Sequence, residues 1–122
     1  HFGDPEDSGF VQEQIVGPGA ADIVCGNDET AARLMSTLDR LGVRIPEEIR
    51  IVGFDDVYYS QHLRVPLTTF HQPCKELGST AVEMMLARIR DPLRALCTVT
   101  VPGTLIVRGS CGGHPTPPGS AG

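Results

Sequence analysis

The sequence predicts an α/β fold, because strand-like and helix-like segments alternate along its 122 residues. A short, mostly apolar run at 21–25 precedes a segment at 28–41 whose apolar residues recur at helical spacing. A β-branched run at 49–54 follows, of the kind that lies buried in a parallel sheet. Strand, helix and strand in this order imply a right-handed crossover between parallel strands.

The helix predicted over 28–41 has clear signals at both ends. Gly26, Asn27 and Asp28 supply the chain break and the capping side chains, and Gly42 suits a left-handed stop. The stripe expected to face the core consists of Ala31, Leu34, Met35, Leu38 and Leu41. The residues expected to face outward are Arg33, Ser36, Thr37 and Arg40.

The second half of the chain is expected to add another strand at 68–72 and a helix from Pro73 to Arg90. The apolar stripe of that helix would consist of Leu77, Ala81, Met85 and Ile89. Two closing strands, at 98–102 and 104–108, would follow. The predicted organisation is therefore a truncated edge rich in glycine and proline at 1–20, a folded part at 21–108, and a disordered Pro/Gly tail at 109–122.

Composition excludes several classes of function. The net charge is -5 and the 10 basic residues are scattered, whereas a surface that binds DNA phosphates needs a basic stripe. No apolar run approaches the roughly 20 residues that span a bilayer. The cysteines, Cys25, Cys74, Cys97 and Cys111, lack metal-site spacing, and we expect separate reduced thiols without a metal.

Three segments in fixed order carry a resemblance: ADIVCGNDETA at 21–31, RIPEEIRIVGFDDV at 44–57 and PLTTFHQPCKELG at 66–78. Together they resemble the distal part of the effector-binding domain of LacI/GalR bacterial transcription regulators. The resemblance implies a periplasmic-binding-protein-like (type I) fold with a doubly wound sheet, of which this chain would hold the C-terminal part. No stretch of the chain matches the family's helix-turn-helix head or its first effector subdomain.

The function that the resemblance implies is sensing. A small polar effector, most simply a sugar or related metabolite, would bind between this part and the absent subdomain and change DNA binding by an amino-terminal head. The family implies a cytoplasmic homodimer with no cofactor, no membrane contact and no enzymatic activity, and its members place the helix after the Asn-Asp pair near the dimer contact. The alternative is a periplasmic solute-binding protein of a sugar transporter, which shares the fold.

Four residues are candidate ligand contacts. Asp28 matches a family aspartate that accepts hydrogen bonds from ligand hydroxyl or ring N–H groups, although an Asn-Asp pair at a helix start can also be a cap. Asn27 is expected to be mainly structural. Gln72 matches a ligand-contacting amide on a segment that crosses between subdomains, with a helix cap as its alternative role. Cys74 matches an apolar ligand-facing position, or is a small buried thiol.

The pair Asp55 and Asp56 follows a buried strand, where paired carboxylates can hold a magnesium ion. No phosphate-binding glycine loop accompanies them, and the family uses this Gly-Phe-Asp-Asp segment structurally. The serine and histidine residues show no nucleophile-elbow setting either. We therefore predict no catalytic residue and no metal ligand.

Overall fold

The structure is a computed structural model that describes residues 3 to 113 and divides into two compact units. The larger unit contains the chain up to His71 and again from Thr104 onward. The smaller unit contains the intervening residues, Gln72 to Gly103. Each unit is described by itself below.

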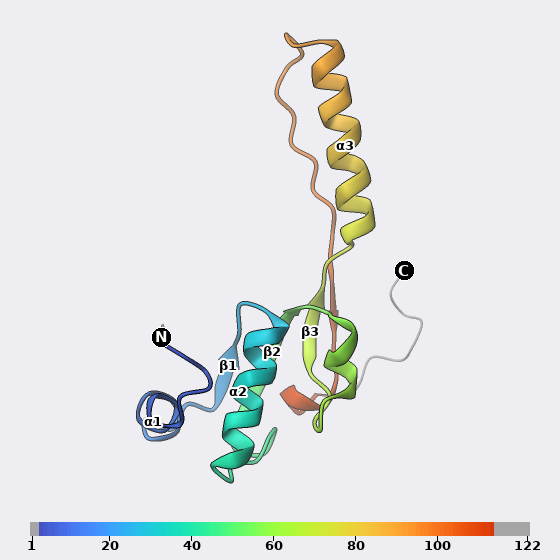
Figure 1. Cartoon of the computed structure of the whole chain (residues 1–122). Coiled ribbons are helices and arrows are strands. Elements are labelled where there is room, and N and C mark those ends of the chain that lie inside the picture. Colours follow the sequence, from blue (N-terminus) through green and yellow to red (C-terminus); the bar gives the residue numbers. More distant parts are fainter. Residues whose placement is uncertain (1–2, 114–122) are drawn as a thin grey trace. The chain divides into compact units, whose positions relative to one another are not determined.

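A four-stranded sheet forms the centre of the larger unit (Figure 1). The strands are β1 (Asp22–Val24), β2 (Arg50–Asp55), β3 (Thr68–His71) and β4 (Thr104–Ile106), in that spatial order. The pairs β1–β2 and β2–β3 are parallel, and β3–β4 is antiparallel. The predicted parallel pairing on either side of the first helix is confirmed.

Helix α2 (Asp28–Arg40) connects β1 to β2 and supplies four of the nine buried residues of the core cluster in the described part of the chain. All five predicted stripe residues are buried or packed against the core cluster, which also contains Ile49, Ile51 and Leu67. The prediction that Thr37 faces outward is wrong: its side chain is fully buried. A threonine tolerates this position because its hydroxyl donates to the Arg33 carbonyl, 3.3 Å away, and accepts from Arg40 at 2.9 Å.

Residues 3–20 are more ordered than a truncated edge would be. Asp7 caps a short helix, α1 (Ser8–Val11), by accepting from the backbone N–H of Gly9, and a π-helical turn, η1 (Gln12–Val16), continues it. Val11 is fully buried and belongs to the core cluster. Burial of this side chain, which a count of glycines and prolines does not reveal, holds the segment in place.

The larger unit is completed by two short 3-10 turns, η2 (Tyr58–His62) and η3 (Gly109–Cys111). The sequence predicted disorder from residue 109, but Ser110 is fully buried and its hydroxyl donates to the Ile51 carbonyl at 2.6 Å. The same hydroxyl accepts from the backbone N–H of Thr68. The rest of the expected tail, from residue 114, lies outside the described residues.

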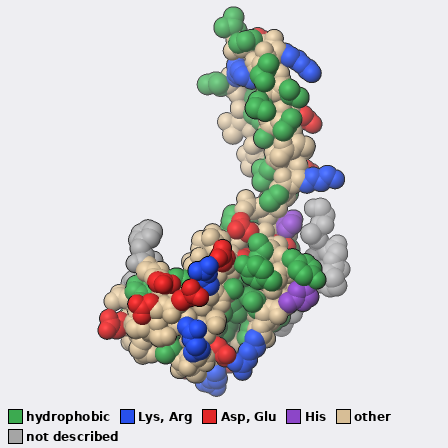
Figure 2. Space-filling view, viewed as in Figure 1, with side chains coloured by type: hydrophobic (Ala, Val, Ile, Leu, Met, Phe, Trp, Pro, Cys, Tyr) green, Lys and Arg blue, Asp and Glu red, His purple; other side chains and the backbone are tan. Residues whose placement is uncertain are grey.

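The smaller unit consists of α3 (Cys74–Arg90) and a return segment, 91–103, without regular structure. The helix agrees with the prediction, whereas the strand expected at 98–102 does not form. No residue of α3 is buried, and exposed apolar side chains gather along the unit (Figure 2). The exposed large apolar residues are Leu77, Val82, Met85, Leu86, Ile89, Leu93, Leu96 and Val99.

Candidate functional site

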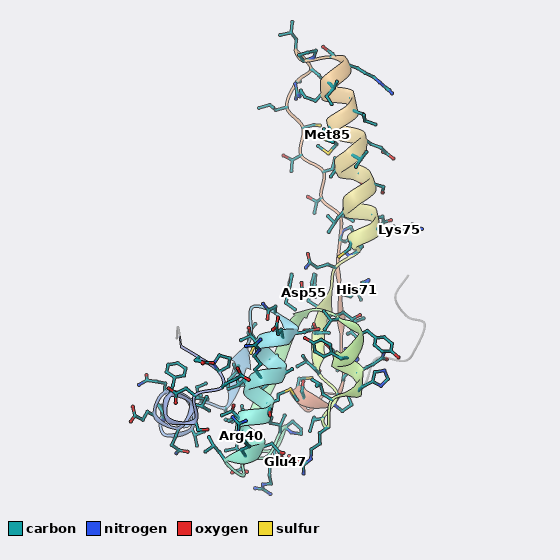
Figure 3. All side chains as sticks on the ribbon, in the orientation of Figure 1. Arg40, Glu47, Asp55, His71, Lys75 and Met85 are labelled. Atoms are coloured by element: carbon teal, nitrogen blue, oxygen red, sulfur yellow. The ribbon has the colours of Figure 1, made fainter. Side chains whose placement is uncertain are left out.

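Polar side chains gather where the parallel strands of the larger unit end. Asp55 is the last residue of β2, and it lies in register with His71, the last residue of β3. Figure 3 shows both labelled side chains at this end of the sheet. Open α/β sheets bind ligands beyond the carboxyl ends of their strands, so this edge is the candidate site.

Asp28 lies beneath this edge, fully buried, with both carboxylate oxygens hydrogen-bonded. Oδ1 accepts from the hydroxyl of Thr69 at 2.6 Å. Oδ2 accepts from the hydroxyl of Ser60 at 2.5 Å and from the backbone N–H of Val57 at 3.0 Å. The carboxylate therefore ties α2 to β3 and to the loop after β2, and it exposes no surface to a ligand.

Gly53 makes room for this carboxylate. A Cβ atom at position 53 would lie 2.2 Å from Oδ1 of Asp28 and 2.9 Å from a methyl group of Leu67. Both approaches are closer than van der Waals contact allows, so the middle of β2 requires glycine for lack of space. The glycine of the Val-Gly-Phe-Asp-Asp segment thus accommodates the aspartate at the start of the helix.

Asn27 caps α2, as expected for a mainly structural residue. Its side-chain oxygen accepts from the backbone N–H of Thr30 at 2.8 Å, and its own backbone is extended. The residue is exposed. The sequence allows either Asn27 or Asp28 to cap the helix. In the structure Asn27 is the cap, and Asp28 accepts hydrogen bonds in the buried network.

Asp55 and Asp56 have an unusual backbone that sequence reasoning did not anticipate. Their φ angles are 112° and 55°, in the region that L-residues other than asparagine and aspartate rarely adopt. Asp55 is partly exposed at the sheet edge. Its place at the end of a buried strand, noted in the sequence as a possible metal site and rejected there, equally suits a carboxylate at the ligand crevice of an α/β fold.

Asp56 is held by two cationic or potentially cationic partners. Its Oδ1 accepts from the Arg108 guanidinium at 2.6 Å, and its Oδ2 lies 3.0 Å from Nδ1 of His71. The backbone N–H of Asp56 also donates to the hydroxyl of Thr69. We call Asp56, Arg108 and His71 the Asp56 cluster. None of its members was predicted as a site residue.

Gln72 and Cys74 belong to the smaller unit, so their predicted ligand contacts are described apart from the sheet edge. Gln72 is partly exposed, and its backbone carbonyl accepts from the backbone N–H of Cys74 at 2.8 Å. Cys74 begins α3 and is exposed. Its alternative role, a small buried thiol, is therefore not what the smaller unit shows. Pro73, rather than Gln72, occupies the cap position of the helix, and it makes no side-chain cap.

The four cysteines are free thiols. Burial, reinforced by the nearby Asp28 carboxylate, raises the pKa of the Cys25 thiol to about 11. Within residues 3 to 113, no group of three or more histidine, cysteine or acidic side chains could hold a metal ion. No helix in the same part of the chain is long and apolar enough to cross a membrane.

A cavity of about 830 Å³ lies at the opposite end of α2 from the candidate edge. Its walls come from the second half of α2 and from the segments around Val43 and Leu63. Asp39 and Arg64, an exposed ion pair, lie at its rim. This cavity shares no lining residue with the sheet edge that carries Asp55.

A family model, described as a periplasmic binding protein-like domain, matches residues 11–111. The chain belongs to this family. The match covers most of the chain, including the N-terminal segment around Val11 and the turn at Ser110 that the sequence-based boundaries left out. The predicted fold class, a periplasmic-binding-protein-like α/β fold, is confirmed.

Curated relatives in this family are transcription regulators. The HTH-type transcriptional repressor PurR of Vibrio vulnificus is 45% identical over 69 residues, which cover 57% of this chain and 21% of the relative. PurR of Photobacterium profundum is 42% identical over the same length, with the same coverage. The chain thus spans about a fifth of the length of these relatives.

Solved structures give the same relationship. A LacI family regulator of Enterococcus faecalis with bound ribose superposes with a TM-score of 0.77 at 32% identity, covering 88% of this chain and 40% of that one. The lac repressor dimer bound to operator and an anti-inducer has a TM-score of 0.74 at 26% identity, covering 85% and 35%. The resemblance to the effector-binding domain of LacI/GalR regulators is confirmed.

Proposed function

We propose that this periplasmic binding protein-like chain is the distal part of an effector sensor in a LacI-type transcription regulator. A small polar metabolite, of the sugar class, would bind at the sheet edge and change DNA binding by a head elsewhere in the longer protein. The observation that carries the proposal is the adjacent placement of Asp55 and His71 at the carboxyl ends of β2 and β3. Similarity to a regulator with bound ribose supports the sugar class.

The geometry favours Asp55 over Asp28 as the carboxylate that meets the effector. Both oxygens of the buried Asp28 are already occupied by three donors of the chain itself. Asp55 is partly exposed, and a carboxylate can accept from two neighbouring hydroxyl groups of a sugar, each bond contributing roughly 1.5 to 3 kcal/mol in a dry site. Contacts from Asn27, Gln72, Cys74 and Asp28 itself stay predictions.

The remaining wall of the effector site would come from the rest of the longer protein. The chain spans about a fifth of its curated relatives, and its smaller unit leaves every residue of α3 unburied. A single helix with a return segment cannot bury enough apolar surface to be stable alone. We therefore propose that the remainder of the domain covers the exposed apolar side chains of α3 and encloses the effector.

We also propose that the longer protein is a homodimer that acts in the cytoplasm. Similarity to the lac repressor dimer supports this assembly, and the cavity beside the second half of α2, lined by apolar and charged side chains, is the surface that we assign to the second copy. The acidic balance of the chain supports DNA binding through another part of the protein rather than through this one. Light scattering of the longer protein tests the dimer; a monomer at micromolar concentration contradicts it.

The alternative function, a periplasmic solute-binding protein of a sugar transporter, would use the same fold and a similar ligand edge. Its curated relatives would be transport proteins, whereas the relatives described above are repressors. The reading frame upstream of His1 distinguishes the two functions. A helix-turn-helix segment there supports the regulator, and a secretory signal peptide supports the transporter component.

The proposed function is tested by measuring effector-dependent DNA release. The longer protein is bound to its own promoter DNA, and D-ribose is titrated into the complex while fluorescence anisotropy reports the bound fraction. Release or tightening that saturates with ribose supports a sugar sensor. An unchanged bound fraction with ribose and with a panel of other monosaccharides contradicts the sugar class.

A further inference from the structure

The chain crosses between its two units at one position of the sheet. It leaves the larger unit after His71 and re-enters it at Thr104, and these two residues are register partners in the β3–β4 ladder. Asp55, the candidate effector carboxylate, is the register partner of His71 on the other side. The effector edge and the crossing point are thus separated by a single strand.

The Asp56 cluster joins the three chain segments that meet at this position. Asp56 follows β2, His71 ends β3, and Arg108 follows β4. The Asp56 and Arg108 side chains are each only 18% exposed, so solvent screens their 2.6 Å contact less than it screens the surface ion pairs of this chain. The contact with His71, whose side chain is 45% exposed, is the more open of the two.

Arg108 is itself held at the start of β3. Its guanidinium donates to the Leu67 carbonyl at 2.9 Å, and its backbone N–H donates to the Thr68 hydroxyl at 2.8 Å. Arg108 therefore presents its second guanidinium nitrogen to Asp56 from a fixed position. Asp56 in turn donates its backbone N–H to Thr69, the same hydroxyl that donates to Asp28.

The positive φ angles of Asp55 and Asp56 need this support. Left-handed backbone costs an aspartate on the order of 1 kcal/mol or more, and such conformations persist where surrounding contacts determine them. Contacts hold this turn on both sides of the Asp56 Cα atom: its backbone N–H donates to Thr69, the next N–H, of Val57, donates to Asp28, and its side chain accepts from Arg108. The direction in which Asp55 leaves the strand follows from the same turn.

We propose that Asp56 is a positioning residue of the effector site, which sets the direction of Asp55 by anchoring the left-handed turn to Arg108 and His71. The assignment of a site to Asp55 rests on the proposed function; the anchoring does not. Asp56 does not contact the effector. The anchor contacts the end of β3 and the residue Arg108 after β4, and these are the strands by which the chain leaves and re-enters the larger unit. The same contacts therefore connect the turn at Asp55 to these two strands.

The test compares three forms of the complete 122-residue chain by NMR: unchanged, Asp56→Asn and Asp39→Asn. Asparagine keeps the size and the tolerance of left-handed backbone, so Asp56→Asn removes the charge and replaces one accepting oxygen by a donating amino group. Asp39→Asn is the matched control, because it removes a carboxylate from an exposed arginine pair. The readouts are the backbone three-bond coupling of Asp55, which is small at its φ of 112° and large in extended backbone, and hydrogen exchange of the Asp56 and Arg108 amides.

In Asp56→Asn we expect the Asp55 coupling to rise toward its extended value and the two amides to exchange roughly tenfold faster or more, in line with loss of a charge-assisted hydrogen bond. The α2 amides should be unaffected, and Asp39→Asn should change none of these readouts. An unchanged Asp55 coupling in a folded Asp56→Asn chain overturns the proposal. If Asp56→Asn does not fold, Arg108→Lys, which keeps the charge and loses the fork, decides by the same readouts.

The outcome is separable from that of the proposed function. A displaced Asp55 in Asp56→Asn, together with no response of the unchanged longer protein to ribose or to the panel of other monosaccharides, leaves the anchoring in place and contradicts the sugar sensor. A ribose response whose affinity falls in Asp56→Asn, but not in Asp39→Asn, supports both. A ribose response that Asp56→Asn leaves unaltered, despite a displaced Asp55, contradicts the role of Asp56 in the site.

Discussion

The hydroxyl of Thr69 donates to the Asp28 carboxylate at 2.6 Å, joining the first residue of α2 to a residue 41 positions later in β3. Both side chains are fully buried. The bond is one of three that the buried carboxyl group accepts, two from hydroxyls and one from a backbone N–H. It makes Asp28 a part of the internal structure of the sheet edge.

Replacing Asp28 by Ala is expected to destabilise the larger unit strongly. The change leaves the donors of Val57, Ser60 and Thr69 without their acceptor in a buried place, and each buried donor left unpaired costs about 1 to 3 kcal/mol in the free energy of unfolding. Loss of a helix cap alone would cost only about 0.5 to 2 kcal/mol. Urea unfolding of the chain measures the difference, with Asp39→Ala as an exposed control. A loss below about 1 kcal/mol would show that the network adds little.

Gly53→Ala tests the space beneath the same carboxylate. The new methyl group would lie 2.2 Å from the Asp28 oxygen, so we expect a loss of about 1 to 3 kcal/mol from overpacking. Gly26→Ala is the matched control, because nothing lies within 4 Å of a Cβ atom there. Thermal unfolding of both variants compares them, and equal midpoints would contradict the steric account of Gly53.

Asn27→Ala is expected to cost about 0.5 to 2 kcal/mol, because Thr30 loses the acceptor of its backbone N–H. Asn27→Asp should retain most of the stability, since a carboxylate caps equally well and suits the helix dipole. Circular dichroism during urea unfolding gives both values. Stability that is the same in the alanine variant as in the unchanged chain would mean that Asn27 is not the cap on which α2 depends.

Thiol reactivity should separate the cysteines. Since burial raises the pKa of Cys25 to about 11, almost none of its reactive thiolate is present at pH 8, and the side chain is also shielded. Cys74 and Cys97 are exposed and should react first with an aromatic disulfide reagent. Mass spectrometry of timed samples identifies the modified residues, and all four should react after denaturation. Labelling of Cys25 at the rate of Cys97 would argue against its burial.

The sequence was sufficient to predict the parts of the fold that rest on local patterns. The apolar spacing of α2, the β-branched run of β2 and the order of the elements each follow from neighbouring residues. The N-terminal segment was underestimated, because the burial of Val11 depends on packing against α2 rather than on local composition. The strand predicted at 98–102 does not form, although the segment contains β-branched residues. A strand needs a partner strand, and this segment pairs with none of the four strands of the sheet.

The site was harder to predict, because its contacts join distant residues. Asp28 reaches residues 29 to 41 positions away, and Arg108 reaches Asp56 across 52. An aspartate at a helix start gives the same sequence pattern whether its side chain binds a ligand or joins an internal hydrogen-bond network. Here the hydroxyls of Ser60 and Thr69, which are distant in sequence, place Asp28 in a network. The left-handed turn at Asp55 was equally hidden, since aspartate accepts that backbone without a glycine to mark it.

Asp55, rather than Asp28, is the carboxylate that we propose to bind the effector. Calorimetric titration of D-ribose into the longer protein, unchanged and with Asp55→Asn, tests this most directly, with Asp39→Asn as the control. Loss of a charge-assisted acceptor predicts a roughly 10- to 100-fold weaker affinity in Asp55→Asn, an unchanged midpoint of unfolding, and normal affinity in the control. Ribose affinity that is the same in a folded Asp55→Asn variant as in the unchanged protein would contradict the account.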